Sequence, residues 1–268
     1  MKILLTSDLH RDGKKLLWLL DEAPEHDALF VAGDLLDIFS NTGFNEQKGG
    51  DLRWRETILQ SGKSFAWCSG NHDFFHGDHT PMAAASPLWM REKPSTKTCI
   101  TDGESRFLET PSGNIAVTTI PWPVHGGDHV VDGYRTTYFD FVKRLLQAGR
   151  KIKNEERVPW IVLNHEPPGG TPLSAAYAAP EADFARRIIE AAEPDFSLHG
   201  HIHQAPTAPG GSGNSARPFV STPVNQPPVN RFTTSSSNGA ARATGPPFGT
   251  ARADRYAPKA IGLYPHEP

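Results

Sequence analysis

The sequence predicts an α/β fold in which the chain alternates between strands and helices. Short apolar runs fit buried strands, and several of the segments between them place apolar residues at helical spacing. Polar motifs follow directly after five of the apolar runs. Because ligands of open α/β sheets gather beyond the carboxyl ends of the strands, these motif positions support the same fold class.

The first third of the chain supplies three of the expected strands and two of the expected helices. The strand patterns are short and almost wholly apolar, which is typical of buried strands bounded by turns. The helical patterns repeat apolar residues every three or four positions. We expect strands at 3–6, 28–32 and 64–68, and helices at 14–20 and 52–60.

The middle of the chain continues the same alternation. Residues 114–120 alternate apolar and polar side chains before the turn at Pro121, as a half-buried strand does. A helix at 181–192 has Pro180 near its start, where proline is well tolerated. The remaining expected elements are a helix at 138–152 and strands at 160–163 and 196–198.

Residues 206–268 differ in composition from residues 1–205. They hold 11 prolines, two acidic residues and six basic residues. This segment therefore carries a formal charge of +4, whereas residues 1–205 carry −7. Apolar residues are scattered without a helix or strand period. We therefore predict one domain at 1–205 and an irregular or disordered Pro/Gly/Ser-rich tail at 206–268.

The overall composition gives no indication of a nucleic-acid-binding, disulfide-rich or membrane-spanning protein. The formal net charge of −3 gives no strong field for nucleic acid or membranes. Two isolated cysteines, Cys68 and Cys99, do not suggest a disulfide framework. The first strand pattern begins at the third residue, and no apolar run is long enough to span a bilayer. We expect a soluble, cytoplasmic protein of undetermined oligomeric state.

Five polar motifs, each after an expected strand, carry residues that bind metals. Together they offer three oxygen-bearing side chains and four imidazoles, which is more than one divalent ion needs. Two ions that share a carboxylate would use all seven, which points to metal-assisted hydrolysis. The motifs are Asp8-Leu9-His10, Gly33-Asp34, Gly70-Asn71-His72-Asp73, Asn164-His165-Glu166 and Gly200-His201-Ile202-His203.

This ordered set resembles the motifs of the calcineurin-like metallophosphoesterases, over residues 1–205. The resemblance implies a double β-sheet sandwich flanked by helices, with a two-metal site at the C-terminal ends of the strands. It also implies the ligand sets. Asp8, His10 and His203 would hold one ion, Asn71, His165 and His201 the other, and Asp34 would bridge them. The mixed donors suit Mn²⁺ first, with Fe or Zn²⁺ as alternatives.

The resemblance also suggests residues that act on the substrate. His72 follows a ligand without being one in the family pattern, so it would protonate the leaving oxygen or hold a phosphate oxygen. Asp37 would pair with His72 and raise its pKa, unless it is a turn or helix-start acid. Arg11 is a candidate phosphate contact, with a surface charge as the alternative. Asp73 and Glu166 are candidates to orient neighbouring histidines.

The expected activity is hydrolysis of a phosphomonoester or phosphodiester by a hydroxide that bridges the two ions. The substrate would be a small phosphate ester or a nucleotide. A nuclease is open but less favoured, because residues 1–205 are acidic. Ile38 replaces the arginine of the family's protein phosphatases. A weakly active metal-binding scaffold that docks partners is the alternative from another class, and a defective product that does not fold is a third.

The segment after Gln204 lacks the further strands and the Asn-Pro-Gly turn that the family pattern carries there. If the reading frame begins one nucleotide earlier, the codons that encode residues 221–224 can also encode Phe-Asn-Pro-Gly. This suggests that roughly the last 55 residues are an out-of-frame readout rather than a genuine tail. Gene sequencing tests this hypothesis, which an early stop codon in the alternative frame would contradict.

Overall fold

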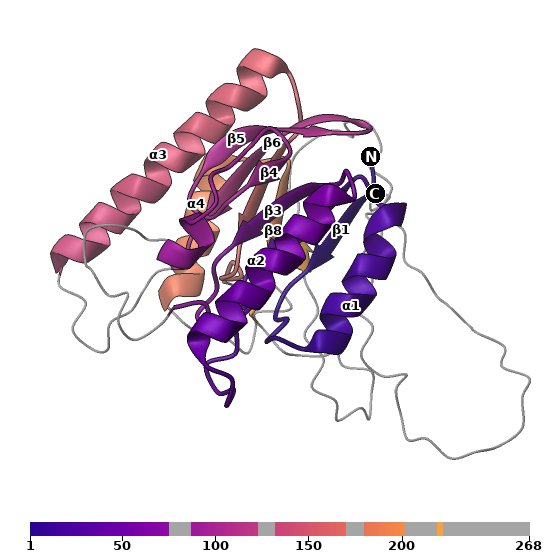
Figure 1. Ribbon diagram of the computed structural model, residues 1–268. Helices are drawn as coiled ribbons and strands as arrows, with labels where there is room; N and C mark the ends of the chain where they lie inside the picture. Colours follow the sequence, from indigo (N-terminus) through magenta and orange to yellow (C-terminus); the bar gives the residue numbers. More distant parts are fainter. Residues whose placement is uncertain (75–86, 123–131, 170–179, 202–218, 222–268) are drawn as a thin grey trace, which may run out of the picture.

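The computed structural model describes residues 1–74, 87–122, 132–169, 180–201 and 219–221. These residues form two β-sheets that pack face to face, with helices on both outer sides (Figure 1). The α/β double-sheet architecture expected from the motifs is confirmed. The boundary between a domain at 1–205 and a tail stays a prediction, because almost all of residues 206–268 lie outside the described residues.

The first sheet is parallel throughout, and its strands follow the order of the chain. Every residue of these strands is buried, because helices cover one face of the sheet and the second sheet covers the other. The strands are β1 (Ile3–Thr6), β2 (Ala28–Ala32), β3 (Ser64–Cys68) and β4 (Cys99–Ile100).

The second sheet is mixed. Its central strands run parallel, and an antiparallel strand flanks them at each edge. Gly113 stands at the tight turn between the first two strands with φ +130°, a conformation that favours glycine. The strands, in spatial order, are β5 (Ser105–Thr110), β6 (Gly113–Ile120), β7 (Trp160–Asn164), β8 (Phe196–His199) and β9 (Phe219–Ser221).

Two helices cover each outer face of the sandwich. Leu16 and Leu19 of α1 (Gly13–Glu22) and Trp54 of α2 (Phe44–Gln60) pack on the first sheet. Val142 of α3 (Asp132–Glu156) and Ala192 of α4 (Pro180–Ala192) belong to the cluster on the second sheet. Two short 3₁₀ helices, η1 (Ala23–Glu25) and η2 (Leu88–Arg91), complete the described elements. The result is four layers, helix–sheet–sheet–helix (Figure 1).

The core between the sheets is apolar. Phe30 and Ala66 of the first sheet share a buried cluster with Val117, Ile161 and Leu163 of the second. None of these five side chains is more than 2% exposed. This dry layer fixes the two sheets relative to each other, so that loops from both sheets can contribute to one site.

Some elements differ from the expectations. α2 begins at Phe44, well before the expected 52, although Gly49 and Gly50 are poor helix formers. Tertiary contacts stabilise this extension, since Gln47 and Asp51 are buried within it. α3 is likewise longer than the expected 138–152.

Strands β4, β5 and β9 were not expected. β9 lies inside the segment predicted to be irregular, yet it pairs with β8 in antiparallel register. The strand β9 therefore corrects the prediction that residues 206–268 are irregular throughout. The reason is that pairing at a sheet edge is a tertiary contact, which composition does not encode.

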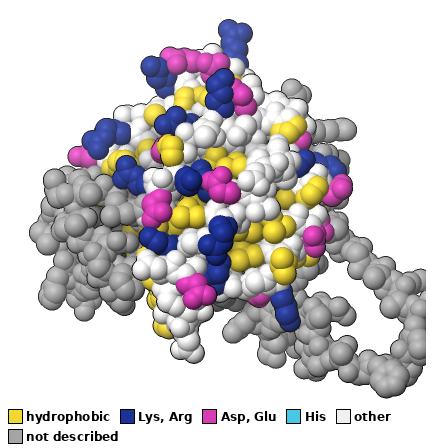
Figure 2. Space-filling view, in the orientation of Figure 1, with side chains coloured by type: hydrophobic (Ala, Val, Ile, Leu, Met, Phe, Trp, Pro, Cys, Tyr) yellow, Lys and Arg dark blue, Asp and Glu magenta, His cyan; other side chains and the backbone are white. Residues whose placement is uncertain are grey.

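The surface over α1 and α2 mixes charges of both signs with apolar side chains (Figure 2). Lysine and arginine side chains alternate with acidic ones, and no broad basic area forms on this face. Among the helices of the described residues, none has the length and apolar character needed to cross a bilayer.

Candidate metal centre

The expected motifs converge at one edge of the sandwich, where strands from both sheets end. Each strand stops just before a loop that carries a polar side chain, so parallel strands deliver those side chains to the same region. Four of them have a φ in the left-handed range, which is uncommon for residues other than glycine. These are Asp8 (54°), His10 (44°), Asp34 (54°) and His201 (71°).

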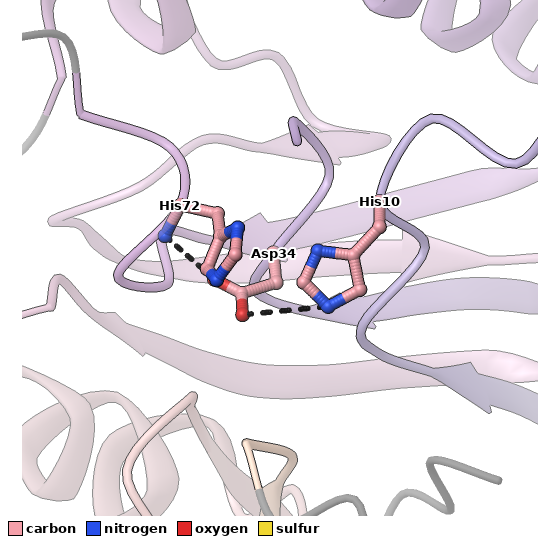
Figure 3. Close-up of side chains that lie close together, drawn as sticks. All are labelled: His10, Asp34 and His72. Carbon is pink, nitrogen blue, oxygen red and sulfur yellow. Dashed lines mark hydrogen bonds and ion pairs between the residues drawn. The ribbon is translucent and has the colours of Figure 1, made fainter. Parts of the chain in front are cut away.

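Asp34 lies at the centre of the convergence. Its Oδ1 accepts a hydrogen bond of 2.9 Å from the backbone N–H of His72. Its Oδ2 lies 3.1 Å from Nε2 of His165 and 3.9 Å from Nε2 of His10 (Figure 3 shows the His10 side). One carboxylate therefore reaches histidines delivered by both sheets, which is the arrangement a bridging ligand requires.

Two groups of possible donor atoms share this carboxylate. The first comprises Asp34, His10 and His72, and the second comprises Asp34, His165 and His201. Within each group the donor atoms lie within 4.8 Å of one another, close enough to surround one ion. His72 was expected to stand apart as a proton donor, yet its ring belongs to the first group and meets the ring of His10 edge to face at 4.5 Å.

Asn71 and Asp8 extend these groups. The side-chain oxygen of Asn71 lies 3.0 Å from Nδ1 of His201, which in turn lies 3.2 Å from Nε2 of His165. Asp8 is buried, and its Oδ2 accepts from the backbone N–H of His201 at 3.2 Å and from the Ser7 hydroxyl. Six of the seven expected ligands thus meet at one place. The seventh, His203, lies outside the described residues.

Asp34 and His165 form a buried charge pair. Burial disfavours both charged forms, and on its own it would raise the pKa of Asp34 and lower that of His165. Their attraction across 3.1 Å outweighs burial: it holds the pKa of Asp34 below its ordinary value and raises that of His165 to about 10. A cation bound by both residues would take the place of that proton.

Asp73 ties together the loops of the centre. Its fully buried carboxylate accepts four backbone N–H bonds, from Asp34, Leu35 and Leu36 at 3.0 Å each and from Gly70 at 2.8 Å. These bonds tie the loop after β2 to the loop after β3. An orienting effect of Asp73 on a neighbouring histidine stays a prediction.

Two motif glycines create the space for the site. A Cβ on Gly33, whose φ is +80°, would lie 2.5 Å from Nδ1 of His165. A Cβ on Gly70 would lie 2.8 Å from Cδ2 of His165 and would also collide with the Asp34 carboxylate. Any larger residue would displace the central pair.

Trp122 borders the centre, although none of the five motifs contains it. Its ring centroid lies 5.4 Å from that of His165 and 4.9 Å from that of His201. Its backbone N–H donates to the Ser69 hydroxyl at 2.9 Å. The signal was its position after strand β6, at the same edge as the motifs.

Arg11 contacts α2, and Asp37 fits the turn-acid alternative given for it. Arg11 donates to Asp51 of α2 at 2.9 Å, and Gly50 leaves room for its guanidinium. The Asp37 carboxylate accepts the backbone N–H of Phe39 at 2.9 Å, as a turn acid does. Among the described contacts, none joins Asp37 to His72. A phosphate contact for Arg11 stays a prediction.

Comparison with known proteins decides the family. The sequence pattern of the calcineurin-like phosphoesterases matches residues 1–205. The chain belongs to this family. The crystal structure of TT1561 from Thermus thermophilus is similar at 15% identity and a TM-score of 0.49, covering 72% of this chain and 78% of that one. No curated protein sequence matches the chain.

Members of this phosphoesterase family are generally hydrolases of phosphoester bonds and typically hold a dinuclear metal site. Family membership and the two donor groups around Asp34 support a general metal-dependent phosphoesterase function.

Proposed function

We propose that the chain hydrolyses phosphate monoesters or diesters with the help of two divalent cations at this centre. The observation that supports it most is the Asp34 carboxylate, which reaches donor groups from both sheets. A structural ion would need only one closed set of ligands. Two adjoining sets around a shared carboxylate suit a pair of ions that act on one phosphoryl group.

The donor chemistry fits such a pair. In this proposal Asp8, His10 and His203 hold one cation, Asn71, His165 and His201 hold the other, and Asp34 touches both. Imidazole, carboxylate and amide donors favour Mn²⁺, with Fe and Zn²⁺ as the alternatives. Once bound, the cations would neutralise phosphoryl charge and lower the pKa of a water molecule, which would supply the nucleophile.

His72 is proposed as the general acid. Its backbone N–H bond to Asp34 fixes the residue beside the shared carboxylate. Its Nδ1 is buried and has no hydrogen-bond partner among the described residues, and its ring packs against the rings of His10 and Phe39. From this position the imidazole can give a proton to the leaving oxygen as the ester bond breaks.

A small ester is favoured over nucleic acid as the substrate. The acidic balance of residues 1–205 and the mixed charges on the α1–α2 face support this choice. Ile38, in place of the arginine of protein phosphatases, argues against a phosphoprotein substrate. A nuclease activity is the alternative within the family.

Hydrolysis of p-nitrophenyl phosphate and bis-p-nitrophenyl phosphate with Mn²⁺ tests the proposal, for the unmodified chain and for His72→Asn. We expect the variant to lose about 100-fold or more in kcat while it keeps two metal ions per chain. The ester that reacts faster distinguishes monoesterase from diesterase.

Metal content, measured on the same samples, separates the roles of His72. If His72→Asn loses an ion together with its activity, His72 is a ligand and the general-acid assignment is wrong. If the folded, metal-loaded chain hydrolyses neither ester, the proposed function is wrong and a metal-binding scaffold takes its place.

A further inference from the structure

Phe39 is the most exposed large hydrophobic side chain in the described residues, at 82%. It lies in the loop that leads from Asp34 toward α2, next to Ile38, which is 50% exposed. Its ring meets the ring of His72 edge to face, with 5.4 Å between the centroids. The exposed phenyl group therefore borders the residue proposed to protonate the leaving oxygen.

The turn that carries Phe39 is held by hydrogen bonds. The Asp37 carboxylate accepts the Phe39 N–H at 2.9 Å, and the Asp37 carbonyl accepts the Ser40 N–H at 3.1 Å. Gln47, buried in α2, accepts the Asp37 N–H at 2.9 Å and donates to the carbonyls of Asp37 at 3.1 Å and Thr42 at 2.8 Å. These bonds anchor the turn that carries the ring to a helix.

An aromatic ring that is held in water by a built turn gives up the stabilisation that burial would provide. A ligand that covers the ring would recover that stabilisation on binding. The Phe39 ring meets His72 on one side, and because the side chain is 82% exposed its remaining surface is available to a second ring at the usual 4.5–7 Å spacing of aromatic pairs.

We propose that Phe39 is the platform for an aromatic ring carried by the leaving group of the substrate. This inference rests on the proposed function, in which His72 gives its proton to the leaving oxygen. The leaving group then lies on the His72 side of the phosphoryl group, and that is the side bordered by Phe39. The substrate class is accordingly a phosphate ester with an aromatic substituent close to the ester oxygen.

Titration calorimetry with two phosphonates tests this inference without any turnover. Phenylphosphonate carries a ring beside the phosphorus and methylphosphonate does not, and neither has an ester bond to hydrolyse. Each would be titrated into the full chain loaded with Mn²⁺, for the unmodified protein and for Phe39→Ala, Phe39→Tyr and Leu17→Ala. Leu17, 65% exposed on α1, is the matched control for loss of an exposed apolar side chain.

We expect the unmodified chain to bind phenylphosphonate about 3- to 10-fold more tightly than methylphosphonate, as an aromatic pair provides. Phe39→Ala should reduce that ratio to near one, whereas Phe39→Tyr and Leu17→Ala should preserve it. Equal affinities in the unmodified chain would overturn the inference, as would a ratio that survives in Phe39→Ala.

The two proposals fail in different ways. A chain that discriminates between the phosphonates through Phe39 but hydrolyses neither p-nitrophenyl ester keeps Phe39 as a ring-binding residue, and it refutes both the hydrolase and the leaving-group role. A chain that hydrolyses the esters and binds both phosphonates equally keeps the hydrolase and refutes the platform.

Discussion

At the scale of single residues, Asp73 is the side chain on which the candidate centre most depends. A carboxylate has enough lone pairs to accept four N–H groups, and Asp73 uses them to join two loops from neighbouring strands. One of those loops carries Asp34 and the other carries Asn71 and His72. The geometry of the donors therefore rests on a residue that is not itself expected to touch the metal.

Asp73→Asn should disrupt this arrangement. An amide replaces one acceptor oxygen with an NH₂ group, which would face backbone N–H donors and leave them unsatisfied in a buried place. We expect a loss of roughly 2–4 kcal/mol in the free energy of unfolding, measured with urea, and weaker Mn²⁺ binding.

Asp12→Asn is the matched control for that change. Asp12 caps α1 by accepting from the N–H groups of Lys14 and Lys15, and asparagine caps helices about as well. Its unfolding free energy should stay within about 0.5 kcal/mol of the unmodified chain. Equal stability of both variants would refute the role given to Asp73.

At the scale of elements, α2 is tied to the loop after β1 by the hydrogen bond from Arg11 to Asp51. The two groups are 2.9 Å apart, and the Asp51 carboxyl is fully buried. Burial raises the pKa of Asp51 to about 7, against the opposing effect of the Arg11 guanidinium. The folded chain therefore binds a proton at Asp51 over a pH range in which the unfolded chain has released it.

Stability should consequently fall as the pH rises from about 4 to about 7. Because the folded pKa lies above the ordinary value of 3.8, the contribution of Asp51 is fully present below the ordinary value and is lost as the pH passes through 7. Between pH 5 and pH 8, we expect the unmodified chain to lose roughly 2–3 kcal/mol relative to Asp51→Asn.

Urea unfolding of both proteins at several pH values measures this difference. The comparison isolates Asp51, since all other titrating groups are common to the two chains. A difference that is constant across the pH range, or that grows in favour of the unmodified chain at high pH, would contradict the raised pKa.

At the scale of the whole molecule, the two sheets are joined by a dry apolar layer and by the candidate centre at its edge. Asp34 and His72 come from loops of the first sheet, whereas His165 and His201 come from loops of the second. Ions bound at this place would connect the sheets a second time. The folded state alone assembles these donors, so metal binding and folding are coupled.

Removal of metal should therefore lower the thermal midpoint. Excess chelator is expected to lower Tm by several degrees, and Mn²⁺ in excess should restore it, because a ligand present at about 100 times its Kd adds about 2.7 kcal/mol of stability. Calorimetric scans with and without chelator measure the shift. In Asp34→Asn, chelator should lower Tm by a much smaller amount. An equal change in Tm in both proteins would show that the metal binds elsewhere.

Much of the site could be predicted because its residues lie in short motifs directly after apolar strands. The strands at 28–32 and 64–68 coincide with β2 and β3, since local periodicity and buried apolar runs are read directly from neighbouring residues. The position of the motifs after these strands, together with the family resemblance, predicted that Asp8, His10 and Asp34 lie close together.

Other features depend on contacts between distant parts of the chain. β9 forms by pairing with β8, and the first turns of α2 bury Gln47 and Asp51, so local propensity did not reveal either element. The same holds for the partner of Arg11, which lies 40 residues along the chain.

The sequence by itself determined the α/β class, the family and the donor chemistry, because strand periodicity and each motif can be read from neighbouring residues, and the order of the motifs is the order of the chain. Only the tertiary structure decided that Asp73 holds loops, that Asp37 supports a turn and that Phe39 is exposed beside His72. Hydrogen bonds and ring contacts depend on where the backbone directs each side chain in space, and that direction is set by packing of the whole fold.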